Sequence, residues 1–281
     1  MALTEATDVL RSAGTVDLAV TETPQELAAA LEGRGEEVVV IAGGDGTMHA
    51  VVAALHARGE LGATTLGLVP LGTGNDFARG NRLPLDPVAA ARVITRGDSR
   101  PVDLLVERDG AVVVNSVHAG AGSLAALRAE RWKQRLGRVG YPIGSALTAL
   151  RPPTLRLSIR VDDDVVATPD HPILQVAVGN GPQVGGGTPL VPEARPHDGQ
   201  LDVIVSRPVG SLALAAYAVD LVRGRHDRRA DVRSVRGRRV TVAGEEFWCS
   251  ADGETYGPVQ EQTWHLEPAA YTLLMPSPAD S

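Results

Sequence analysis

The stretch from Val38 to Thr47 constrains the fold of this chain more than any other. Five apolar residues, four of them β-branched, run directly into the sequence GGDGT at residues 43–47. A short apolar run of this kind is typical of a parallel strand covered on both faces. The glycines let the backbone turn and approach a ligand closely, and a helix is predicted from about Met48. Because a helix N-terminus favours a phosphate, this turn predicts a nucleotide site. The carboxylate of Asp45 beside phosphates needs a cation, which indicates Mg²⁺-nucleotide chemistry.

Composition excludes several classes of protein. The chain has 281 residues, a formal net charge of −7 and a single cysteine, Cys249. The negative charge argues against nucleic-acid binding. The single cysteine excludes an internal disulfide framework and fits a reducing cytoplasm. Met1 to Arg11 lacks the apolar centre of a signal peptide, and no apolar run reaches the roughly 18 residues that span a membrane. We therefore predict a cytoplasmic protein of one large or two modest domains.

The only lysine, Lys133, restricts how phosphates can be held. P-loop enzymes need a lysine within G-x-x-x-x-G-K-[ST], and protein kinases need one on their third strand. Lys133 lies in neither context. Any ATP bound here must therefore be held by backbone amides, arginines and a metal.

The first hundred residues alternate predicted strands and helices, which favours a parallel α/β sheet. The predicted strands are Val16–Thr21, Val38–Ala42 and Thr64–Pro70. Helices are predicted after Thr23-Pro24, where a capping box is complete, at about Met48, and after Asp86-Pro87. The third strand ends in a second glycine-rich turn, LGTGNDFAR at residues 71–79. Ligands in such sheets lie at the carboxyl ends of strands, where both turns occur.

After about residue 100 the pattern changes to strand-like runs separated by Gly, Pro and Asp, which favours an antiparallel β domain. The predicted strands are Val102–Val106, Ala111–Asn115, Leu155–Val161, Ile173–Val178, Leu201–Val205, Val240–Val242 and Tyr271–Met275. Two helical stretches, Leu124–Leu136 and Leu212–Val222, interrupt them. The predicted fold is therefore α/β + β. An N-terminal parallel α/β nucleotide-binding domain (residues 1–103) precedes a C-terminal antiparallel β-rich, sandwich-like domain (residues 104–281).

An ordered set of motifs resembles the bacterial diacylglycerol kinase and sphingosine kinase family of lipid kinases. The set comprises GGDGT at 43–47, PLGTGND at 70–76, then GN at 179–180, GGG at 185–187, PEA at 192–194, DGQLD at 198–202 and DGE at 252–254. NAD kinases share the first motif, whereas the whole set is the lipid-kinase type. The resemblance covers roughly residues 16 to 276. It implies an active site in the cleft between the two domains, where the γ-phosphoryl group of ATP passes to a lipid hydroxyl with the help of Mg²⁺.

The resemblance also implies a set of nucleotide-binding residues. A plain strand-to-helix turn is the alternative interpretation of the glycine turn, but free amides and a hydroxyl at a helix N-terminus suit a phosphate. The predicted ATP-binding residues are Thr21, Gly43, Gly44, Asp45, Gly46, Thr47, Thr73 and Asn75.

Acidic residues near strand ends supply the predicted metal site. Asp45, Asp76 and Asp103 would repel one another without a cation, and the resemblance implies that they surround a catalytic Mg²⁺. Turn or cap duty is the alternative for Asp76 and Asp103. Asp198 resembles the ligand of a second, structural Mg²⁺. The predicted metal ligands are Asp76, Asp103, Asp198 and the backbone oxygens of Arg195 and Gln200.

The Asp252-Gly253-Glu254 motif supplies the predicted base. Phosphoryl transfer needs positioning, charge neutralisation and a carboxylate that accepts the hydroxyl proton. The resemblance implies that a carboxylate of this motif has that role. We favour Glu254, with Asp252 as its neighbour, so the predicted catalytic residues are Glu254, Asp252 and Asp45.

Two basic stretches, Leu124–Arg138 and Arg223–Arg239, leave a membrane-surface role open. An amphipathic helix covering the sheet and a solvated hairpin are the respective alternatives. Two departures from the family pattern also matter. The family's first strand with its N-P-x-[SA]-G turn has no counterpart here, so Val16–Thr21 corresponds to the family's second strand. Val117–Gly122 differs from the usual I-G-x-x-A, so the lipid is not implied.

The sequence as a whole predicts an ATP- and Mg²⁺-dependent lipid kinase that acts on diacylglycerol or a similar lipid. NAD kinase is the alternative enzyme, and a non-catalytic nucleotide- or lipid-binding protein is the alternative class. The expected partners are ATP and a lipid substrate, without nucleic acid. Contact with the inner face of the membrane and a homodimer are left open.

Overall fold

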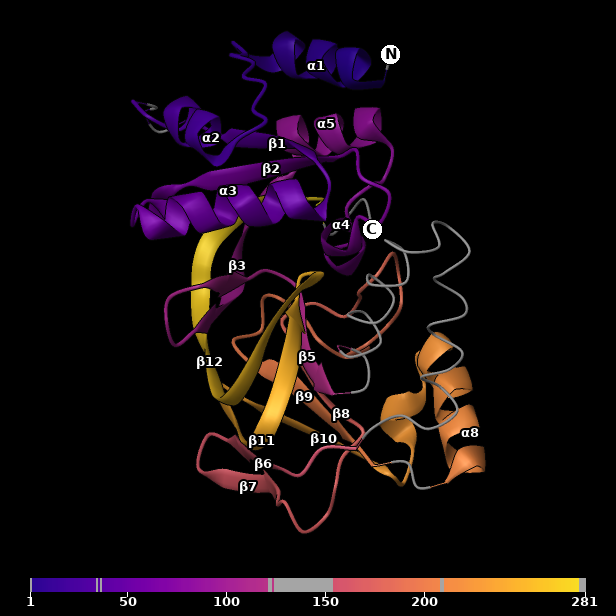
Figure 1. Cartoon of the computed structure of the whole chain (residues 1–281). Helices are drawn as coiled ribbons and strands as arrows, with labels where there is room; N and C mark the ends of the chain where they lie inside the picture. The colour runs from indigo at the N-terminus through magenta and orange to yellow at the C-terminus, as the bar shows by residue number, and fades with distance from the viewer. Residues whose placement is uncertain are drawn as a thin grey trace, which may run out of the picture.

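The computed structural model describes residues 2–33, 35, 37–120, 123, 154–207 and 210–277 (Figure 1). The predicted helical stretch Leu124–Leu136, the basic stretch Leu124–Arg138 that contains it, and the end of the Val117–Gly122 stretch lie outside these residues. Among the described residues, no helix is long and apolar enough to cross a membrane.

The helices and strands alternate in the first half and give way to strands in the second. The helices are α1 (Ala2–Ala13), α2 (Pro24–Ala30), α3 (Asp45–Ala57), α4 (Asp76–Gly80), α5 (Pro87–Arg96) and α8 (Ser211–Val222), with 3₁₀ turns η1 (Leu61–Ala63) and η3 (His226–Arg228). The strands are β1 (Val39–Gly43), β2 (Thr65–Pro70), β3 (Asp98–Glu107), β4 (Val112–Val113), β5 (Ser116–Gly120), β6 (Leu157–Val161), β7 (Asp164–Ala167), β8 (Gln175–Gly179), β9 (Leu201–Ser206), β10 (Val232–Gly237), β11 (Arg239–Ala251) and β12 (Glu254–Met275).

The N-terminal unit is a parallel α/β layer, as predicted. Strand β1 pairs in parallel with β2, and β2 pairs in parallel with the end of β12. Helix α3 covers one face through Met48, Val52 and Leu55, while α1 and α5 cover the other (Figure 1). Because apolar side chains meet helices on both faces, these strands are continuously hydrophobic.

Two of the predicted helix starts are confirmed in detail. Thr23 caps α2 with a complete capping box in which Glu26 is the reciprocal partner, and the Asp86 carboxylate accepts the amide of Ala89 at 2.8 Å to cap α5. Helix α3 begins at Asp45, three residues before the predicted start. The reason is that the Gly44 carbonyl already accepts the amide of Met48 at 3.0 Å.

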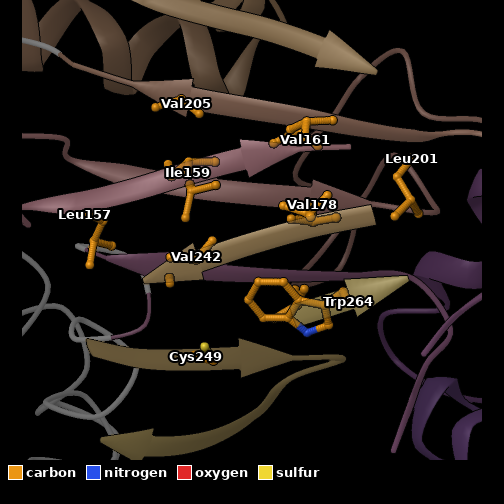
Figure 2. Packing of buried hydrophobic residues seen from close by; sticks show 14 of the residues in the cluster. Leu157, Ile159, Val161, Val178, Leu201, Val205, Val242, Cys249 and Trp264 are labelled. Carbon is orange, nitrogen blue, oxygen red and sulfur yellow. The ribbon is translucent and has the colours of Figure 1, made fainter. Parts of the chain in front are cut away.

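The C-terminal unit is built mainly from antiparallel pairs, again as predicted. Strand β8 lies between β5 and β9, and β11 pairs with β12, β5 and β6. Inward-facing side chains of these strands form one core around Trp264 and Phe247, both 1% exposed (Figure 2). Strand β3 serves both units, since Val102 and Leu104 pack in the first core and Leu105 in the second. The predicted boundary at residue 103 therefore falls inside a strand.

Two predictions about local structure are corrected, and one helix was missed. The segment Val16–Thr21 is not a strand, because no described strand lies beside it, and Val20 is 82% exposed. The helix α1 was not predicted, although Ala6, Val9 and Leu10 have helical spacing and pack together. The run Tyr271–Met275 belongs to the first unit rather than to the antiparallel domain, since Leu273 pairs in parallel with Leu66.

Candidate active site

The two glycine-rich turns meet where neighbouring parallel strands end. The carbonyl of Gly43 accepts the amide of Leu71 at 2.9 Å. A Cβ atom on Gly72 would lie 2.6 Å from the Cα of Gly44, so the two backbones touch at a distance that only glycine allows. The sequence prediction that β1 and β2 bring these turns to one sheet edge is therefore confirmed by the fold.

The N-terminus of α3 offers unpaired amides to an anion. Its N-cap, Gly44, has no side chain to cap it, and the first intrahelical bond comes from Met48. The amides of residues 45–47 therefore have no acceptor within the helix. A Cβ atom on Gly46 would have no neighbour within 4 Å, and Thr47 is exposed. This geometry suits a phosphate group.

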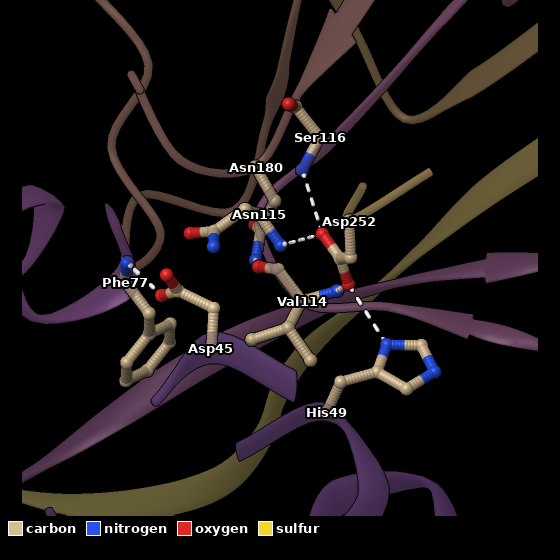
Figure 3. Close-up of polar contacts among 8 residues, drawn as sticks. All are labelled: Asp45, His49, Phe77, Val114, Asn115, Ser116, Asn180 and Asp252. Atoms are coloured by element: carbon tan, nitrogen blue, oxygen red, sulfur yellow. Dashed lines mark hydrogen bonds and ion pairs between the residues drawn. The ribbon is translucent and has the colours of Figure 1, made fainter. Parts of the chain in front are cut away.

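Asp45 caps a second helix across the turn. Its Oδ2 accepts the amide of Asp76 at 3.0 Å, and its Oδ1 accepts the amide of Phe77 at 2.9 Å (Figure 3). These are the first two amides of α4. Asn75 supports the same turn, since its side chain exchanges two hydrogen bonds with the backbone of Gly72 while its own backbone is left-handed with φ of 53°.

Asp76 and Asp103 accept amides from the C-terminal half of the chain. Asp76 binds the amides of Gly186 and Gly187 at 2.9 and 2.6 Å. Asp103 binds the amides of Gly199 and Ala269 at 2.7 and 2.8 Å. Both side chains are buried. The GGG and DGQLD motifs are thereby fixed against the first unit.

Of the acids predicted to surround the catalytic Mg²⁺, only Asp45 and Asp76 are placed to share a cation. Among the described residues, no three His, Cys, Asp or Glu side chains gather into a ready-made cage. However, a Cβ atom on Gly74 would lie 3.1 Å from Asp45 Oδ2 and 3.6 Å from Asp76 Oδ2, so both carboxylates border the same space. Because Mg²⁺ usually takes one or two carboxylates together with phosphates and water, this pair fits Mg²⁺ that arrives with a nucleotide.

The surroundings of Asp198 do not fit the predicted structural metal. The guanidinium of Arg236 pairs with Oδ2 of Asp198, while Oδ1 accepts the amide of Gln200 at 3.1 Å. The carbonyl of Arg195 already accepts the amide of His197 at 2.8 Å. An arginine therefore neutralises the carboxylate that the resemblance assigns to a metal.

The Asp252-Gly253-Glu254 turn reaches α3 from the other end of the chain. Oδ1 of Asp252 accepts the amide of Asn115 at 2.9 Å and that of Ser116 at 3.3 Å, while Oδ2 accepts the amide of Val114 at 2.6 Å. Oδ2 also lies 2.9 Å from Nδ1 of His49 (Figure 3). Glu254, in contrast, is exposed.

Sequence reasoning missed two polar residues of this cleft. His49 follows the glycine turn by one helical turn, and its hydrogen bond with Asp252 raises the pKa of the imidazole above its ordinary value against the opposing effect of burial. Asn180 is completely buried and donates to the carbonyls of Asp103 and Val114 at 2.9 and 3.0 Å. Only its place in the GN motif marked Asn180 beforehand, and nothing in the sequence linked His49 with Asp252.

Of the other predicted nucleotide-binding residues, Thr73 lies at the glycine turns and Thr21 does not. Thr73 is exposed in the second glycine turn, beside Gly72. Thr21 lies in the irregular segment before α2, and none of the hydrogen bonds among the described residues joins it to either turn.

Two family descriptions match the chain, one for each unit. The diacylglycerol kinase catalytic domain matches residues 1–106. The YegS C-terminal NAD kinase beta sandwich-like domain matches residues 115–275. Together they cover both halves of the site described above.

Related bacterial proteins are named as probable lipid kinases. A protein of Xanthomonas campestris named "Probable lipid kinase YegS-like" is 32% identical over 99% of this chain and 92% of its own length. Proteins of the same name from Serratia proteamaculans and Pseudomonas aeruginosa are 36% and 39% identical, and in both the match spans 55% of the relative's length.

Solved structures show the same fold. A diacylglycerol kinase from Bacillus anthracis superimposes with a TM-score of 0.73 at 24% identity, covering 99% of this chain and 91% of that one. An NAD kinase from Archaeoglobus fulgidus in complex with ATP gives a TM-score of 0.53 at 12% identity. At these identities the likeness concerns the fold alone.

Proposed function

This chain belongs to the YegS-like, diacylglycerol kinase-like family of lipid kinases, and we propose that it transfers the γ-phosphoryl group of ATP to the hydroxyl group of diacylglycerol or a similar lipid. The observation that best supports this reaction is the contact between His49 and Asp252. It holds the turn that carries Glu254 beside the helix whose N-terminus suits a phosphate.

In the proposed reaction the amides at the start of α3 bind the phosphates of ATP. Asp45 and Asp76 are the residues that would hold Mg²⁺ with the nucleotide, and the ion would neutralise phosphate charge. Thr47 and Thr73 are exposed beside the two turns and can donate hydroxyl hydrogen bonds to phosphate oxygens.

Glu254 is the proposed general base. Asp252 is a poor candidate because three amides and an imidazole already bind its two oxygens. Glu254 is exposed two residues further along, so its carboxylate is free to accept the proton of a lipid hydroxyl. Asp252 then acts by fixing the turn from which Glu254 projects.

The lipid acceptor implies work at a membrane surface, so the proposal includes transient contact with the inner face of the membrane. The basic stretch Arg223–Arg239 is one candidate for this membrane contact. Two of its arginines are already paired within the protein, Arg229 with Asp220 and Asp231, and Arg236 with Asp198, so these two are less available to lipid headgroups.

A direct assay tests the proposed reaction. Radiolabelled ATP is incubated with Mg²⁺ and either diacylglycerol in mixed micelles or NAD, and the labelled product is identified. We expect labelled lipid from the wild-type protein, a decrease of about 10²- to 10⁴-fold in Glu254→Gln, and unchanged activity in Glu246→Gln, which alters an exposed glutamate on β11. Transfer to NAD but not to lipid would refute the proposal.

A further inference from the structure

His49 lies on the helix that begins at the phosphate turn, and it makes the contact with Asp252 on which the proposed function relies. Its side chain is 29% exposed, and Nδ1 lies 2.9 Å from Oδ2 of Asp252, whose side chain is only 5% exposed. The two residues are 203 positions apart in the sequence. A hydrogen bond between a partly exposed imidazole and a nearly buried carboxylate, at the junction of the two units, therefore joins α3 to the turn that carries Glu254.

We propose that His49 is a positioning residue, which fixes the Asp252-Gly253-Glu254 turn relative to the N-terminus of α3. This inference rests on the proposed lipid kinase function. Residues 46 and 49 are separated by about 4.5 Å along a helix axis, so one rigid helix carries both the phosphate-binding amides and the contact that sets the base.

The turn is the two-residue connection of the β11–β12 hairpin, in which Ala251 pairs with Glu254, and its centre makes few contacts beyond that pairing. Asp252 has a left-handed backbone with φ of 46°, and Gly253 has φ of 91°. A Cβ atom on Gly253 would have no neighbour within 4 Å, so open space surrounds the centre of the turn. The hydrogen bonds to Asp252 hold it instead, and three of them come from the loop between β4 and the start of β5. The bond from His49 is the one that comes from α3.

Charge supports the same role. The hydrogen bond to Asp252, and the negative charges of Asp252 and Glu254 that face the ring, raise the pKa of His49. A protonated imidazole offsets the charge of Asp252 beside Glu254 and donates through Nδ1, which makes this a charge-assisted bond.

Helix α3 also provides a matched control. His56, near the other end of the helix, places Nε2 3.1 Å from Oε2 of Glu267 on β12, and its side chain is 23% exposed. Replacing His56 removes a comparable histidine–carboxylate contact from the same helix, far from the glycine turn.

The test is steady-state kinetics of diacylglycerol phosphorylation in mixed micelles for the wild type, His49→Ala, His49→Asn and His56→Ala. We expect His49→Ala to lower kcat by about ten- to hundredfold, the loss that corresponds to one charged hydrogen bond, with KM for ATP changed less than about threefold. An asparagine amide can donate from nearly the position of Nδ1 but carries no charge, so His49→Asn should recover part of kcat. In the wild type kcat should decrease as the pH rises through the raised pKa of His49, and this decrease should vanish in His49→Asn.

The possible failures are distinguishable. An active wild type in which His49→Ala retains kcat overturns the positioning role and leaves the proposed function standing. An equal loss in His56→Ala also overturns it, since the effect would then reflect general loosening of α3. A wild-type protein that phosphorylates no lipid overturns the proposed function, and the role of His49 in it falls too.

Discussion

Replacing Asp45 by alanine should destabilise the fold as well as the reaction. The Asp45 carboxylate accepts the amides of Asp76 and Phe77 at 3.0 and 2.9 Å, and these bonds join residues that are 31 and 32 positions apart. A hydrogen bond to a charged group contributes about 1.5–3 kcal/mol. Because the Asp45 side chain is only partly buried, we expect Asp45→Ala to lower the free energy of unfolding by about 2–4 kcal/mol for the two bonds together.

The measurement is urea denaturation at neutral pH, with thermal unfolding beside it. For a protein of this size the expected loss corresponds to a decrease in Tm of roughly 3–7 °C. Asp45→Asn keeps one acceptor oxygen and should lose about half as much. Asp86→Ala is the matched control, because it removes a single exposed cap from α5 and should cost about 1 kcal/mol without altering activity.

Two results would refute the reasoning. Unchanged stability of Asp45→Ala would show that its carboxylate does not hold α4. A loss no larger than that of Asp86→Ala would show that the second bond contributes nothing. Either result would leave the reaction as the only role proposed for Asp45. The expected result means that lost activity in Asp45→Ala must be interpreted beside the stability of the same variant.

Three further predictions concern glycine turns and a buried histidine. Gly46→Ala should raise KM for ATP severalfold at unchanged Tm, because its Cβ meets no protein atom within 4 Å and would enter the phosphate space. Gly72→Ala should lower the free energy of unfolding by about 1–3 kcal/mol in urea, since its Cβ would lie 2.6 Å from the Cα of Gly44. Burial lowers the pKa of His118 to about 4, so the native state disfavours the imidazolium. Stability should decrease as the pH falls from about 6.5 towards 4, and urea midpoints of His118→Gln should show a shallower decrease.

The local parts of the fold could be predicted because their causes are local. The capping box at Thr23 and the cap at Asp86 fix two helix starts within four residues of sequence. Strand pairing depends on neighbours that are distant in sequence, and two predictions that depend on it were wrong, although the parallel and antiparallel character of the two units was predicted correctly. Val16–Thr21 has strand-like composition but no described strand beside it. Tyr271–Met275 was assigned to the wrong unit because no local pattern shows that it pairs with β2.

The motifs single out the acidic residues of the candidate site one by one, but the partners of these residues could not be predicted. The motifs identified Asp76 and Asp103 as acids at the cleft. Nothing in their spacing shows that each accepts two amides from the C-terminal half. The same holds for Asp198, where the partner is Arg236, an arginine on a strand that was not predicted.

These contacts change the physical account of the acidic residues. Acids gathered at one sheet edge were expected to need a cation, yet Asp45, Asp76 and Asp103 each accept two backbone amides. Amide donors satisfy a carboxylate without neutralising its charge. Under the proposed function, Mg²⁺ that arrives with ATP would offset the charge of Asp45 and Asp76. The amides that bind Asp76 and Asp103 come from Gly186, Gly187, Gly199 and Ala269, so these two acids also hold the C-terminal half of the chain against the first unit. Under the proposed function these acids have two roles: Asp45 and Asp76 would hold the metal that accompanies the nucleotide, and the amide contacts keep the two units in the fixed arrangement that phosphoryl transfer requires.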